Sequence, residues 1–127
     1  MSQTKQADFD ATFEQLRNIL QAYESKLIVV ADTKNHYALE TPHVMKNKHR
    51  LYFAGIKIGK SYVSYYLMPA YACDDVRVAI SAELKKRMQG KSCFNFSSPD
   101  PKLFKELSQL TKLGFKRFTS KEFYSRL

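Results

Sequence analysis

The chain has 127 residues, of which 44% are hydrophobic and 13% aromatic, and this composition excludes an intrinsically disordered protein. The length predicts one domain with a single hydrophobic core, spanning residues 1–127. The net charge of +9 is uneven, because residues 1–45 hold four basic and six acidic side chains and residues 46–127 hold 17 and six. That imbalance favours an anionic partner, although a solubilising surface that needs no partner is the simpler explanation.

The N-terminal residues are polar and contain no apolar run of signal-peptide length. The longest apolar run, residues 27–31, is too short to cross a bilayer. Cys73 and Cys93 are the two cysteines, and in a chain without an export signal we expect them to be reduced thiols. The sequence therefore predicts a cytoplasmic protein without a membrane segment.

The first predicted element is an amphipathic helix over residues 8–24, with Asp8 as its N-cap. Its apolar side chains recur at steps of four, three, four and three residues, which place them on one helix face. They are Phe9, Phe13, Leu16, Leu20 and Tyr23. Residues 1–7 are expected to be flexible.

Four strands are predicted next. The β-branched run 27–31 is typical of a strand, and the residues DTKN that follow are typical of a turn. Residues 36–41 then predict a returning strand that stops at Pro42. A basic loop over 42–50 precedes a hairpin over 51–68. Gly59 and Lys60 are expected to be the two central residues of a type II′ turn, and this turn fixes how the two strands of the hairpin pair. It pairs Lys57 with Tyr62, Gly55 with Ser64, Phe53 with Tyr66 and Leu51 with Met68.

The second half alternates helical and strand patterns. Ser81 is in the position of an N-cap for the predicted helix AELKKRM. Gly90 is in the position of the glycine that commonly follows a helix end. A short strand is predicted for SCFNFS. Asp100 before Pro101 predicts a second cap, for a helix that ends at Gly114, and residues 115–127 form a C-terminal extension. The predicted order is α-β-β-β-β-α-β-α, an α+β fold with a mostly antiparallel sheet of about five strands.

The letters GKS at residues 90–92 resemble the end of a phosphate-binding loop. That motif needs an earlier glycine five residues upstream, where Lys85 stands here. It also needs a strand before the loop and a helix after it, and the predicted order here is the reverse. We therefore interpret Gly90 as the glycine that ends a helix and Lys91 as a cation near that helix C-terminus.

The predicted hairpin suggests a ligand site. Gly55 opposite Ser64 leaves little side-chain volume in the middle of one sheet face, and aromatic rings with one cation surround that gap, as in small-ligand sites. Alternatively, a helix packs into the gap. The basic run 85–87, with Lys91, adds cations for an anion. The candidate ligand-binding residues are Phe53, Lys57, Tyr62, Ser64, Tyr66, Arg87 and Lys91.

Other chemistries have weaker support. The three histidines and two cysteines lack zinc-ligand spacing, which leaves a metal site assembled from distant residues as the alternative to none. No metal ligand, cofactor or catalytic residue is assigned. Cys93 as an enzyme nucleophile stays an alternative to a buried thiol. The tyrosines near lysines also suit nucleic-acid binding or a homodimer interface, but the RNA-recognition signature is absent.

The segments KIGKSYVSYYLMPAY and ISAELKKRMQGKSCFNF resemble the YdhG-like family of small bacterial proteins, a domain of unknown function. The resemblance covers roughly residues 40–115 and implies a compact cytoplasmic α+β domain. Some relatives are described as frataxin-like iron chaperones, which implies an iron site built from carboxylates, here Asp74, Asp75 and Glu83. The strongly basic second half argues against that role. The leading hypothesis is a non-enzymatic domain that binds a small or anionic ligand.

Overall fold

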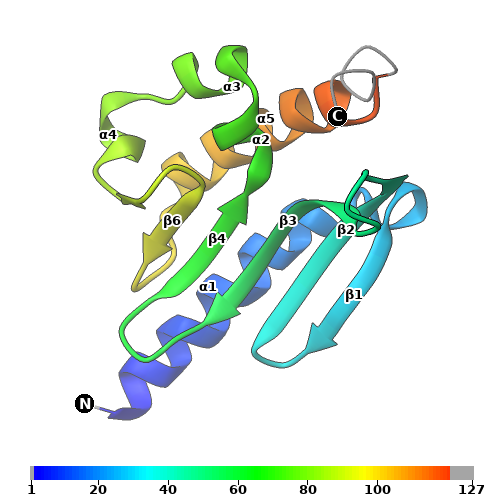
Figure 1. Cartoon of the computed structure of the whole chain (residues 1–127). Helices are drawn as coiled ribbons and strands as arrows, with labels where there is room; N and C mark the ends of the chain where they lie inside the picture. The colour runs from blue at the N-terminus through cyan, green and yellow to red at the C-terminus, as the bar shows by residue number, and fades with distance from the viewer. Residues whose placement is uncertain (1, 121–127) are drawn as a thin grey trace.

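The computed structural model describes residues 2–120, which form six antiparallel strands and the helices packed on them (Figure 1). The predicted α+β class is confirmed, with one strand more than expected. The strand order is β1-β2-β3-β4-β6-β5. The strands are β1 (Ile28–Thr33), β2 (His36–Val44), β3 (Arg50–Ile58), β4 (Val63–Leu67), β5 (Met88–Gln89) and β6 (Cys93–Phe96). The helices are α1 (Ser2–Gln21), the short 3-10 helix η1 (Glu24–Lys26), α2 (Met68–Ala72), α3 (Asp74–Val78), α4 (Ala82–Lys85) and α5 (Pro101–Phe118).

The two long helices, α1 and α5, cover the same face of the sheet (Figure 1). In β4, Val63, Tyr65 and Leu67 are fully buried against them, whereas Ser64 and Tyr66 alternate with these residues and are partly exposed. The uncovered side of the sheet is called the outer face below. Its residues on the central strands are Tyr52, Gly55, Lys57, Ser64, Tyr66, Cys93 and Asn95.

A bulge in β3 turns Phe53 toward the helices. Leu39 of β2 pairs with Ala54 and the next residue, Glu40, pairs with Tyr52, so Phe53 is an extra residue on β3. Phe53 and Ala54 are consequently both fully buried, although neighbours in a regular strand point to opposite faces. The ring of Phe53 packs 5.9 Å from that of Phe115 and 6.1 Å from that of Phe118, between ring centroids.

The register predicted for the β3–β4 hairpin is wrong. Ile58 pairs with Val63, so four residues, 59–62, connect the strands instead of two. Gly55 therefore lies opposite Tyr66, and Lys57 opposite Ser64. The two faces keep their predicted residues, except at the bulge, because the register shift is even.

Several predicted boundaries also differ. Helix α1 begins at Ser2, so it includes residues 2–7, and Asp8 lies inside it as the acceptor of a hydrogen bond from Thr12 Oγ1. Strand β2 continues past Pro42 to Val44, because the register shifts after Glu40 and relieves the need for a ladder N–H there. Residues 121–127 of the predicted extension lie outside the described residues.

Gly114 does not end the last helix, which continues to Phe118. A Cβ atom on Gly114 would lie 2.7 Å from Cβ and 2.8 Å from Cγ of Pro69, so glycine here lets α2 approach α5. The predicted caps at both α4 and α5 are confirmed: Ser81 Oγ accepts from Leu84 N at 3.1 Å, and Asp100 Oδ1 accepts from Leu103 N at 3.1 Å.

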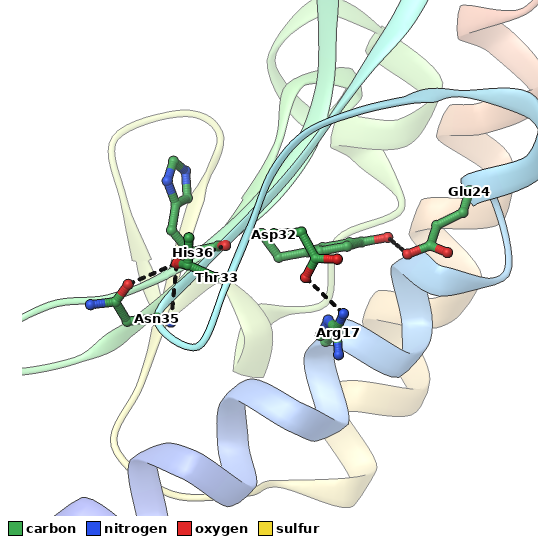
Figure 2. A network of polar contacts seen from close by, with 7 residues as sticks. Arg17, Glu24, Asp32, Thr33, Asn35 and His36 are labelled. Atoms are coloured by element: carbon green, nitrogen blue, oxygen red, sulfur yellow. Dashed lines mark hydrogen bonds and ion pairs between the residues drawn. The ribbon is translucent and has the colours of Figure 1, made fainter.

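Polar contacts join α1 to the first hairpin. Figure 2 shows Arg17 of α1 reaching Asp32 of β1, at 2.8 Å between Nη2 and Oδ1. The hydroxyl of buried Tyr37 donates to Glu24 Oε1 at 2.5 Å, which satisfies its polar end at the interface. Strand β1 lies at the edge of the sheet and carries a bulge of its own between Val29 and Ala31.

Among the helices of residues 2–120, none combines the length and the apolar character needed to cross a membrane.

Replacing Gly114 by Ala is expected to lower the free energy of unfolding by about 1–3 kcal/mol, because the rigid Pro69 ring must move away from the added methyl group. Chemical denaturation checks this. The matched control is Ser108→Ala, at an exposed position of the same helix. Equal stability of Gly114→Ala and the control would show that the approach of α2 does not constrain position 114.

The pH dependence of stability follows from Tyr65, whose hydroxyl lies 2.6 Å from Thr111 Oγ1. Burial raises the pKa of Tyr65 above its ordinary value of 10.0. As pH rises, the Tyr65 hydroxyl therefore loses its proton in the unfolded chain before it does so in the folded chain. The contribution of this hydroxyl to the free energy of unfolding is complete below pH 10 and falls as pH rises above 10. We expect a loss of up to about 1.4 kcal/mol per pH unit above pH 10 from this residue.

Denaturant titrations on both sides of pH 10 measure this slope. Tyr65→Phe is the control, since Thr111 Oγ1 still donates to the Leu107 carbonyl at 2.7 Å. The slope of the variant should be smaller, and an unchanged slope would contradict the assignment to Tyr65.

Candidate functional site

A polar hollow of about 400 Å³ opens beside the outer face, where α4, β5 and β6 meet the β3–β4 connection. Four of its side chains carry N–H donors, one is a tyrosine, and no carboxylate lines it among the described residues. The lining residues are Tyr62, Lys86, Arg87, Met88, Gln89 and Asn95. We call this site the polar hollow.

Asn95 connects the strands that floor the polar hollow. Its Oδ1 accepts from Ser64 Oγ of β4 at 2.6 Å and from Cys93 Sγ at 3.3 Å. Its Nδ2 donates to Gln89 Oε1 of β5 at 3.0 Å. Because the oxygen of Gln89 is engaged, its amide nitrogen remains as a donor for a ligand.

The cations of the polar hollow are held by the short helix α4. Ser81 donates to Glu106 of α5 through both its backbone N, at 2.8 Å, and its Oγ, at 2.7 Å, which fixes the start of α4. Arg87 N then donates to the Leu84 carbonyl at 2.9 Å, and the Arg87 carbonyl accepts from Asn95 N at 2.8 Å. The backbone that carries Lys86 and Arg87 is thus bonded on both sides.

The two cations differ in their partners. Arg87 Nη2 lies 3.8 Å from Asp100 Oδ2, and the guanidinium carbon lies 5.9 Å from the centroid of the Phe96 ring. The ion pair is long and exposed, so it neutralises little of the Arg87 charge. Lys86 is exposed and makes no ion pair within the described part of the chain. A positive potential therefore faces the hollow.

The structure brings four of the predicted site residues together. Tyr62 and Arg87 line the polar hollow, and Ser64 contacts it through its hydrogen bond to Asn95. Lys57 is exposed on the outer face and pairs with Ser64 across the β3–β4 ladder. These residues come from three separate segments, and the sheet pairing aligns them.

The other three predicted site residues lie elsewhere. Phe53 is in the core, because of the bulge in β3. Tyr66 is on the outer face but lies opposite Gly55 and Cys93, nearer the other end of β4. Lys91 is in the turn between β5 and β6, with its Nζ 5.6 Å from the centroid of the Tyr71 ring.

The depression predicted at Gly55 is filled. The hydroxyl of Tyr52 lies 2.2 Å from the position that a Cβ atom on Gly55 would take, and the Tyr37 carbonyl lies at 2.9 Å. Burial raises the pKa of Tyr52, and Tyr66 and Glu40 nearby add to this effect. Gly55 therefore admits a tyrosine from its own strand, not a ligand.

Sequence reasoning missed Gln89 and Asn95. The predicted helix AELKKRM includes Met88, whereas α4 ends at Lys85 and Met88 and Gln89 form β5, in which Gln89 pairs with Cys93 of β6. Gly90, with φ of +77°, is the turn between these strands and not the glycine of a helix end. GKS accordingly lies between two antiparallel strands, which is not the setting of a phosphate-binding loop.

The carboxylates considered for iron each face a cation. Asp74 pairs with Arg77, Asp75 Oδ2 lies 2.5 Å from Arg117 Nε, and Glu83 Oε2 lies 3.4 Å from Lys102 Nζ. A search of the described residues finds no group of three metal-ligating side chains. Iron binding stays an expectation that rests on the family resemblance alone.

Both cysteines are free thiols, as expected. Cys93 lies in strand β6, as predicted, but it is partly exposed and not buried. Its thiol points to the Asn95 amide oxygen on the outer face, so it is a member of the same polar network. A nucleophilic role for Cys93 stays a prediction.

No protein-family model, curated protein or solved structure matches this chain. The similarity to the YdhG-like family therefore stays a prediction from the sequence.

Replacing Gly55 by Ala is expected to lower the free energy of unfolding by about 1–3 kcal/mol, because the Tyr37 carbonyl leaves no room for the methyl group. Thermal and denaturant unfolding measure the change. The double variant Gly55→Ala/Tyr52→Phe should lose less free energy of unfolding than the sum of the two single variants. The reason is that Tyr52→Phe removes the hydroxyl oxygen nearest to the added methyl group. Strict additivity would contradict the contact between Tyr52 and position 55.

Proposed function

We propose that this protein is a binding domain for a small anionic ligand, held in the polar hollow. The observation that supports this most directly is the donor set: Lys86, Arg87 and Gln89 present N–H groups to one hollow of about 400 Å³ that no described carboxylate lines. Ligand pockets commonly have volumes of roughly 300–1,000 Å³, so the size suits a small molecule.

The donor types favour a phosphorylated or carboxylated ligand. The guanidinium of Arg87 can give two parallel hydrogen bonds to the oxygens of one anion, the Gln89 amide adds a further N–H donor, and the ammonium of Lys86 adds charge. Tyr62 is 49% exposed at the rim, which leaves its ring available for contact with a flat or apolar part of the ligand. The uneven charge of the chain would raise the local concentration of such an anion.

The test compares adenosine monophosphate, inorganic phosphate and adenosine by calorimetry and by amide shifts in nuclear magnetic resonance spectra. We expect both phosphorylated probes to bind, more weakly as salt increases, and adenosine to bind least. Lys86→Gln should lower the affinity for adenosine monophosphate by about tenfold. Tyr62→Ala should lower the affinity for adenosine monophosphate and leave the affinity for inorganic phosphate unchanged.

Lys105→Gln is the matched control, because Lys105 is exposed on α5 outside the hollow and the charge change is the same. Equal effects of Lys86→Gln and Lys105→Gln would reduce the proposal to general charge attraction and overturn it. Much tighter binding of a short single-stranded oligonucleotide, with shifts that extend to Lys57 and Tyr66, would replace the small-ligand site by a nucleic-acid surface.

A further inference from the structure

A second hollow lies on the helical side of the molecule, between the end of α1 and the last three turns of α5. Its volume is about 680 Å³, and most of its surface is apolar. We call it the helix cleft. Its lining residues are Ala22, Tyr23, Lys26, Gln109, Lys112, Leu113, Phe115, Lys116 and Thr119.

Two aromatic rings form the floor of the helix cleft. The ring centroids of Tyr23 and Phe115 are 4.8 Å apart, and both rings also approach Phe53 of the core, at 6.2 Å and 5.9 Å. Tyr23, Leu113 and Phe115 are only partly buried against the core, so apolar surface remains in the cleft. The floor is continuous with the core, since its rings pack on the fully buried Phe53.

Lysines stand on both sides of this floor. Lys112 and Lys116 are four residues apart on α5 and therefore on one helix face, and Lys26 lies across the cleft with its Nζ 5.9 Å from the Phe115 ring centroid. All three are exposed, and none forms an ion pair among the described residues. No carboxylate is among the described lining residues.

Like charges at this helical spacing repel each other, and no acidic side chain among the described lining residues compensates them. An anion between them relieves the repulsion, and an apolar body attached to that anion covers the aromatic floor. We infer that the helix cleft binds a small amphiphilic carboxylate, with its chain on Tyr23 and Phe115 and its carboxylate among Lys26, Lys112 and Lys116.

This site is independent of the polar hollow. The two share no lining residue and lie on opposite sides of the sheet, and their ligands differ in kind. The polar hollow offers several donors and little apolar surface, whereas the helix cleft offers an extended apolar surface with charge only at the rim.

The probe is decanoate, followed by amide shifts in nuclear magnetic resonance spectra of the full chain, with decanol as the uncharged probe of equal chain length. We expect saturable shifts centred on Ala22, Lys26, Leu113 and Lys116, and about tenfold weaker binding of decanol. Ala22→Phe should reduce binding by filling the cleft from an exposed position that the fold tolerates.

The charge test uses the double variant Lys112→Gln/Lys116→Gln. This variant should lower the affinity for decanoate by about tenfold and leave the affinity for decanol unchanged. The matched control is Lys102→Gln/Lys105→Gln, with the same charge change on the same helix outside the cleft. Equal loss in both double variants, equal affinity for decanoate and decanol, or shifts centred on Gln89 and Asn95 would each overturn the inference. These outcomes leave the nucleotide test untouched, since it reports on other residues.

Discussion

Phe53 and Ala54 are neighbours in β3, and both point to the helices, which the two-residue period of a strand allows only at a bulge. Burying the Phe53 side chain contributes roughly 1.5–3 kcal/mol, and each ring pair around it adds about 0.5–1.5 kcal/mol. Its partners are Tyr23, in the turn after α1, and Phe115 and Phe118, near the end of α5. The bulge therefore sets where the two long helices converge and supports the aromatic floor of the helix cleft.

The same bulge shapes the outer face. With Phe53 withdrawn to the core, the nearest aromatic side chain of β3 on that face is Tyr52, and it lies across Gly55. The polar groups that remain accessible are those farther along, at Ser64 and Asn95. One inserted residue thus lies between an apolar hollow on the helical side and a polar one beside the opposite face, and the two hollows differ in the chemistry of their lining side chains.

Much of the fold could be predicted because its signals are local. The cap residues Ser81 and Asp100 act within three residues, and the apolar period of α1 needs no partner to be recognised. What failed depends on distant contacts. Gly114 looks like a helix end until Pro69 is seen against it, and the bulge at Phe53 is settled by packing with Phe115 and Phe118. Tyr62, Ser64 and Arg87 lie near one another in the structure, whereas the position of Gln89 and Asn95 beside them depends on the pairing of β5 with β6.

The bulge between Val29 and Ala31 bears on how the sheet ends. Strand β1 is an edge strand, and its exposed valines at 29 and 30 are the kind of surface on which another polypeptide can add a strand. The irregular register breaks the even row of backbone donors and acceptors that such an added strand would need. At the opposite edge, β5 is only two residues long. Both margins thus disfavour the addition of another strand, which works against aggregation when the chain is concentrated.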